Sequence, residues 1–147
     1  MSDQSFHQEV KKGIAEAEQG NTLEALFHLE TAALSGSTPT LASYLGYCLA
    51  SERHQYKKGA RLCLEALKEE PQQALHYLNL GRVYLAAGEK ARAIRTMHQG
   101  LRLGRNRLLL GELKKLGLRK QPVFRSLARG HPLNKHAGLL FTRLGVR

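Results

Sequence analysis

The amino-acid sequence repeats itself at intervals of about 34 residues, and this period restricts the folds that the chain can adopt. Small or medium-sized residues recur at the same phase of the period. The matching positions are Gly20, His54 and Gly88; Ala25, Gly59 and Ala93; Leu29, Cys63 and Met97; and Ala32, Ala66 and Gly100. A fixed period of this length indicates stacked supersecondary units, each of which buries its apolar face against a neighbour.

The most regular unit lies between residues 73 and 106 and predicts two helices. Its first helix has a face at i, i+3, i+4 and i+7, formed by Tyr77, Leu80, Gly81 and Tyr84. Ala93 begins the corresponding face of the second helix, and Gly88 separates the two. A glycine inside a helix costs about 1 kcal/mol relative to alanine. We therefore expect Gly81 to mark the point where the two helices approach closely.

This pattern resembles the tetratricopeptide repeat (TPR) family, whose signature combines an aromatic residue, Leu-Gly, Tyr, Ala, a large apolar residue and Pro. The third unit matches best, the second matches in part, and the first keeps Gly13, Ala25, Leu29 and Ala32. The resemblance covers about residues 5–106. It implies an all-α, right-handed solenoid of about three helix-turn-helix repeats, at about residues 5–38, 39–72 and 73–106.

Residues 107–147 are expected to form a capping helix and a basic C-terminal extension. Leu109, Leu113 and Leu116 share one face of the capping helix, and two short amphipathic helices are predicted near residues 122–129 and 133–144. An end helix of this kind covers the apolar face that a terminal repeat would otherwise expose.

Helix starts are predicted from local signals. Asn21 followed by Glu24 is similar to a capping box. Pro39 and Pro71 are both expected at the first position of a helix, where proline is favoured.

The sequence shows few signs of catalytic chemistry. Cys48 and Cys63 have no C-x-x-C context, and they are expected to be buried, reduced thiols. Phosphate-binding glycine loops and H-E-x-x-H are absent from the sequence, and the carboxylates of the second half, Glu89 and Glu112, are far apart. We therefore expect a non-enzymatic protein with no cofactor and no metal. No signal peptide and no membrane span are predicted, so a cytoplasmic location is expected.

The resemblance implies a concave groove lined by the first helix of each repeat. In the first repeat this face carries His7, Lys11, Ile14 and Glu18. The residues that we expect to contact a protein or peptide partner in this groove are Lys11, Tyr44, Tyr47, Asn79 and Arg82. The alternatives are that the two tyrosines only pack between repeats and that Asn79 and Arg82 form a solvated helix face.

Charge is divided unevenly along the chain. Residues 1–75 hold seven Lys/Arg and ten Asp/Glu, whereas residues 76–147 hold sixteen Lys/Arg and two Glu. A dense basic patch follows the repeats and contains Arg102, Arg105, Arg107, Lys114, Lys115, Arg119, Lys120, Arg125 and Arg129. Such a patch is typical of a polyanion-binding surface. An acidic protein partner, nucleic acid and an anionic membrane are alternatives, and so is a solubilising face that pairs with the acidic half of the same chain.

The sequence therefore predicts a protein-protein interaction scaffold or adaptor that binds a peptide or protein segment in its groove, with an acidic partner as one form of this function. The alternative is a polyanion-binding protein that acts through its basic C-terminal region.

Overall fold

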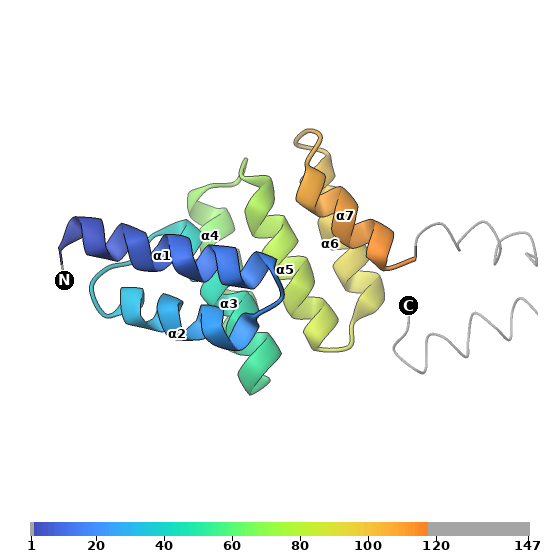
Figure 1. Ribbon diagram of the computed structural model, residues 1–147. Coiled ribbons are helices and arrows are strands. Elements are labelled where there is room, and N and C mark those ends of the chain that lie inside the picture. The colour runs from blue at the N-terminus through green and yellow to red at the C-terminus, as the bar shows by residue number, and fades with distance from the viewer. Residues whose placement is uncertain (1, 118–147) are drawn as a thin grey trace, which may run out of the picture.

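The computed structural model describes residues 2–117, which fold into seven α-helices without any strand in that range (Figure 1). The helices are α1 (Asp3–Glu18), α2 (Thr22–Ala33), α3 (Pro39–Arg53), α4 (Tyr56–Glu69), α5 (Ala74–Ala86), α6 (Lys90–Leu101) and α7 (Arg107–Lys115). The expected all-α class is confirmed for this part of the chain.

The helices pack as successive pairs joined by short turns. Helix α1 packs against α2, α3 against α4, and α5 against α6. Helix α3 also contacts α2 and α5, while α7 packs on α6 and α5. The result is a helical arrangement in which a similar pair is repeated along the chain.

The residues that recur every 34 positions form the contacts within the pairs. Ala25 and Leu29 on α2, Cys63 on α4, and Ala93 and Met97 on α6 are all fully buried. One apolar cluster joins α1, α2 and α3, a second joins α3, α4, α5 and α6, and a third joins α5, α6 and α7. The period therefore marks the buried face of the second helix in each pair.

Glycines lie where two helices come closest. A Cβ atom on Gly81 would lie 2.7 Å from Met97 Cγ and 3.3 Å from the Ala93 carbonyl oxygen, as the sequence predicts. The contact in the second pair is tighter, because a Cβ atom on Gly46 would lie 2.5 Å from the Gly59 carbonyl oxygen. Gly88 has φ +83° and forms the turn between α5 and α6. A side chain there would be strained, which explains the glycine.

The helix starts confirm one local prediction and correct two others. Pro39 is the first residue of α3, and the hydroxyl of the preceding Thr38 accepts a hydrogen bond from Leu41 N–H at 3.1 Å. Pro71 lies in the turn before α5, which begins at Ala74. Asn21 precedes α2, but it makes no side-chain cap.

The side-chain amide of Asn21 instead donates to Glu16 Oε2 at 2.8 Å. This interaction with α1 is present in place of the predicted capping box.

The predicted capping helix is present as α7. The Asn106 side chain accepts a hydrogen bond from Leu109 N–H at 3.0 Å and thereby caps the helix. Leu109 and Leu113 are buried against Leu78 and Met97. The two short helices predicted near residues 122–129 and 133–144 lie outside the described residues. Within residues 2–117, no helix is both long and apolar enough to cross a bilayer.

Candidate functional site

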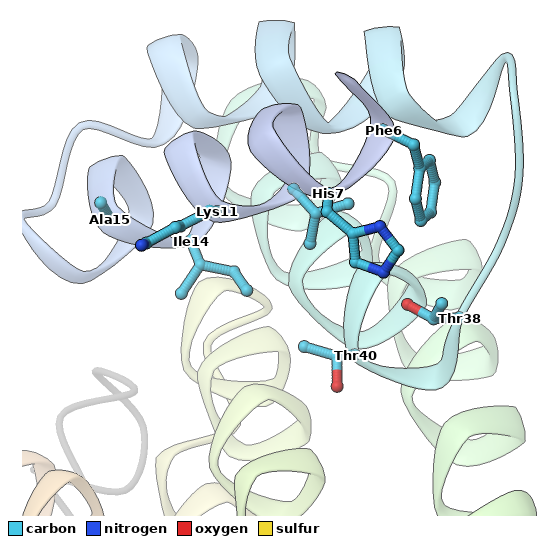
Figure 2. Close-up of a pocket in the computed structure, with 8 residues that line it drawn as sticks. Phe6, His7, Lys11, Ile14, Ala15, Thr38 and Thr40 are labelled. Carbon is cyan, nitrogen blue, oxygen red and sulfur yellow. The ribbon is translucent and has the colours of Figure 1, made fainter. Parts of the chain in front are cut away.

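An apolar groove of about 500 Å³ lies between α1 and the start of α3 (Figure 2). It is lined by Phe6, His7, Val10, Lys11, Ile14, Ala15, Thr38 and Thr40. His7, Lys11 and Ile14 follow the i, i+4, i+7 spacing of one helix face, so a single side of α1 supplies most of the lining. The groove therefore combines an apolar floor with a few polar groups at its edge.

The polar side chains of the groove lie at two places, His7 near the two threonines and Lys11 farther along α1. Figure 2 shows the His7 ring turned toward Thr38 and Thr40, while Lys11 extends along α1 past Ile14. His7 Nδ1 lies 2.8 Å from the Asp3 carbonyl oxygen. A carbonyl oxygen only accepts hydrogen bonds, so Nδ1 carries the proton. In the neutral ring, Nε2 is consequently available to accept a hydrogen bond from a bound molecule.

Three of the five residues expected to line a partner groove lie in the interior instead. The exposed fraction is 2% for Tyr44, 0% for Asn79 and 6% for Arg82. Their side chains face other helices of the same chain, which corrects the prediction of an open surface for Tyr44 and Asn79, while Arg82 also borders the small cavity described below. Lys11 lines the apolar groove, and Tyr47 is half-buried against Arg82, whose Cζ lies 4.8 Å from the tyrosine ring centroid.

Arg82 is the centre of a polar network that joins α1, α5 and α7. Its guanidinium donates to both carboxylate oxygens of Glu18, at 2.7 and 3.0 Å, and to Glu112 Oε1 at 3.3 Å. It also donates to Asn79 Oδ1 at 3.0 Å, while the Tyr44 hydroxyl donates to Glu18. A buried charge needs this degree of pairing, because an unpaired ion in the interior is strongly destabilising.

The network shifts the pKa of its acidic and basic members in opposite directions. Burial raises the pKa of the Glu18 carboxyl, but the hydrogen bonds from Arg82 and Tyr44 outweigh this and lower the pKa below its usual 4.5. Burial lowers the pKa of Arg82, but the bond and charge of Glu18 raise it above its usual value. Both groups are therefore ionised across the neutral range.

A second buried network connects α3 with α5 and the turn before it. His76 Nδ1 lies 3.0 Å from Ser43 Oγ, and His76 Nε2 lies 2.7 Å from Glu70 Oε1. The Asn79 side chain donates to the same Ser43 oxygen at 3.1 Å. This serine, histidine and carboxylate lie in a row, but Ser43 and His76 are fully buried. The row satisfies polar groups of the helix interface, where a substrate has no access to the serine.

A smaller cavity of about 220 Å³ lies where the end of α1 faces α7. Arg107 and Lys115 of the predicted basic patch line it, together with Glu18 and Glu112. Tyr47 and Arg82, two of the residues predicted for the partner groove, line it as well. The charge of Lys115 contributes to the lowered pKa of Glu18. Part of the basic patch is thus placed beside carboxylates of the same chain, as one of the alternative interpretations expects.

The remaining members of the basic patch are divided between the surface and the undescribed part of the chain. Arg102 follows the last residue of α6, Arg105 lies in the next turn and Lys114 lies at the end of α7, and all three are exposed. Arg119, Lys120, Arg125 and Arg129 lie outside the described residues. The nine residues are therefore not established as one surface.

The cysteines are buried free thiols, as predicted. Burial raises the pKa of Cys48 to about 12 and that of Cys63 above its usual value. Both sulfurs consequently remain protonated and unreactive near neutral pH. Among residues 2–117, no group of three or more His, Cys, Asp or Glu side chains is placed to hold a metal ion.

Sequence reasoning missed two features of these sites. Phe6 and Val10 line the groove, although the predicted face consisted of His7, Lys11, Ile14 and Glu18. Glu18 and Glu112 bind the same guanidinium, although 94 positions separate them in the sequence. Asn79 and Arg82 lie three residues apart on one helix face, and this spacing could have predicted that polar groups meet there.

No protein-family model matches the chain, and no curated protein sequence matches it either.

Proposed function

We propose that the chain is a non-enzymatic interaction scaffold of the TPR type, and that it binds an apolar segment of a partner protein in the groove between α1 and the start of α3. The observation that carries this proposal is the composition of the lining, which places Phe6, Val10 and Ile14 beside Lys11 and His7 in an open space of about 500 Å³. Open, largely apolar grooves with a few placed polar groups are typical of binding sites.

The groove also favours a particular partner chemistry. Among the residues of positions 2–117 that line the groove, Lys11 alone has a fixed charge, and none is a carboxylate. An amphipathic segment with an acidic residue next to its apolar side chains would pair its charge with Lys11. The His7 ring and the hydroxyls of Thr38 and Thr40 would exchange hydrogen bonds with its polar groups.

The buried network is consistent with a scaffold role. Glu18, Arg82 and Glu112 join α1, α5 and α7, and thereby hold the helix that forms the groove against the rest of the array. A preformed groove loses less conformational entropy on binding than one that must first be ordered.

A displayed library of random peptides, selected on the full chain, tests the proposal. An enriched peptide is then titrated calorimetrically against the wild type, Ile14→Glu and Lys11→Glu. The matched control for Ile14→Glu is Leu23→Glu on α2, which introduces the same charge at a side chain that is 68% exposed and outside the groove.

We expect both groove variants to weaken binding by about tenfold or more, because a buried contact or the complementary charge is lost. The control should bind as the wild type does. Enriched peptides with equal affinity for the folded groove variants would contradict the proposal, and so would a library from which no peptide is enriched. Circular dichroism identifies any variant that fails to fold.

A further inference from the structure

The outward side of α6 carries a row of two arginines and a histidine without a single acidic residue. Ala93, Thr96, Met97 and Gly100 form the buried face of this helix. Arg95, His98 and Arg102 are exposed on the opposite side, at i, i+3 and i+7. We refer to these three residues as the α6 row. Arg105 is also exposed, in the turn that follows the helix.

The carboxylates closest in sequence to this row are both occupied elsewhere. The chain has no Asp or Glu between Glu89 and Glu112. Glu89 pairs with Arg92 at 3.2 Å, and Glu112 faces the interior, where it accepts from Arg82. Within residues 2–117, the structure gives Arg95, Arg102 and Arg105 no ion-pair partner. The positive charge of the row is therefore directed at the solvent.

The equivalent rows of the other pairs differ from that of α6. At the same phase of the 34-residue period, the rows read Phe27, Glu30 and Leu34 for α2, and Arg61, Leu64 and Lys68 for α4. Apolar side chains occupy these rows, with exposed fractions of 63% for Phe27, 88% for Leu34 and 49% for Leu64. Among these three rows, large apolar groups are missing only from the α6 row, so two arginines without an exposed apolar side chain between them are specific to the third pair.

We propose that the α6 row binds the phosphate backbone of a nucleic acid duplex. Arg95 and Arg102 are separated along the helix axis by about 10 Å, which corresponds to about three base-pair steps of a duplex. Two guanidinium groups at this spacing can contact separate phosphates. Arginine suits this contact, since its planar group donates two hydrogen bonds to one phosphate.

The composition of α6 favours a duplex over the other polyanions. Residues 90–105 contain no Phe, Tyr or Trp, so they offer no stacking platform for the bases of a single strand. The α6 row also lacks the large apolar side chains that an interfacial helix inserts into an anionic membrane, and Leu103, which is 37% exposed, is a single such side chain beside it. A row of arginines without aromatic side chains that stack on bases or apolar side chains that insert into a membrane fits a partner with regularly spaced phosphates.

Fluorescence anisotropy with a labelled mixed-sequence DNA duplex of about 24 base pairs, in about 50 to 200 mM NaCl, tests this proposal on the full chain. The double variant Arg95→Gln/Arg102→Gln removes the charges and keeps long side chains that favour a helix. The matched control is Lys57→Gln/Lys58→Gln, at two exposed positions in the first turn of α4. Both double variants lower the net charge from +11 by two.

We expect the α6 variant to weaken duplex binding about tenfold and to reduce the slope of log K against log salt by about 2. The α4 control should change the affinity by less than about threefold. Equal losses in the two variants would overturn the proposal, because they would indicate a response to net charge alone. An unchanged affinity of the α6 variant, or no duplex binding by the wild type at about 50 mM salt, would also overturn it. Binding to phosphatidylserine vesicles without duplex binding would do the same.

Discussion

Arg82 on α5 binds Glu18 at the end of α1 with two hydrogen bonds, of 2.7 and 3.0 Å, across 64 residues of sequence. The same guanidinium reaches Glu112 on α7. One side chain thereby connects the first helix, the third pair and the last described helix. Because Arg82 is only 6% exposed, its charge depends on these partners rather than on water.

Arg82→Met is expected to lower the free energy of unfolding by about 3 kcal/mol, because two partly buried carboxylates lose their cation. Urea denaturation followed by circular dichroism measures this difference. The control is Arg53→Met, which removes another two-bond pair, to Glu30, in which both side chains are more than 40% exposed. This pair should contribute no more than about 1 kcal/mol. Equal losses from the two variants would contradict a special role for Arg82.

The lowered pKa of Glu18 predicts a loss of stability in acid. A carboxyl whose pKa is lower in the folded than in the unfolded state stabilises the fold fully above the unfolded value, here 4.5. This contribution is lost as the pH falls from there through the folded pKa. The free energy of unfolding should therefore decrease below pH 4.5, and the decrease should be smaller in Glu18→Gln, whose amide does not titrate.

Urea titrations at several pH values, from neutral to acidic, give the required profile. Glu9 contributes a separate acid-sensitive interaction, since the hydrogen bond to His28 lowers the pKa of Glu9. Part of the decrease should consequently persist in Glu18→Gln. Identical profiles for this variant and the wild type would contradict the assignment to Glu18.

The sequence predicted most of the helical pairing because the pairs are local. Gly81, Ala93 and Met97 lie within one repeat period, and the spacing of small and apolar residues determines which sides of two adjacent helices meet. The helix starts predicted at Asn21 and Pro71 were wrong in detail. There, a contact with Glu16 and a turn after α4 determined the outcome.

The candidate site was harder to predict because its partners are far apart in the sequence. Periodicity places Tyr44, Asn79 and Arg82 on the inward-facing side of their helices, but it does not reveal what lies opposite. Glu18 and Glu112 occupy that space, so an expected binding surface is an internal network instead. Such pairing depends on how successive helices stack, and the spacing of residues within one helix does not predict it.

The two thiols should be unreactive in the folded protein. Burial raises the pKa of Cys48 to about 12, so almost none of its thiol is ionised at neutral pH. Neither Cys48 nor Cys63 should react with Ellman's reagent near pH 8 in the absence of denaturant, and both should react in urea. Ser35→Cys supplies an exposed thiol as a positive control. Rapid labelling of the folded wild type would contradict the burial of both sulfurs.

Two glycines inside helices should respond to alanine in opposite ways. A Cβ atom on Gly46 would lie 2.5 Å from the Gly59 carbonyl oxygen, so α3 and α4 would have to separate. Overpacking of this kind typically costs about 1 to 3 kcal/mol. A Cβ atom on Gly111, in α7, would meet nothing within 4 Å in the described part of the chain. Gly111→Ala should therefore stabilise the protein by up to about 1 kcal/mol through helix propensity alone.

Urea denaturation of the two single variants measures both effects, and Gly81→Ala provides an intermediate case. There the nearest atoms belong to the side chain of Met97, at 2.7 and 2.8 Å, and this flexible chain can move aside more readily than a backbone carbonyl. We expect the order of stability to be Gly111→Ala, wild type, Gly81→Ala and Gly46→Ala. A Gly46→Ala protein as stable as the wild type would show that α3 and α4 are not held in close backbone contact.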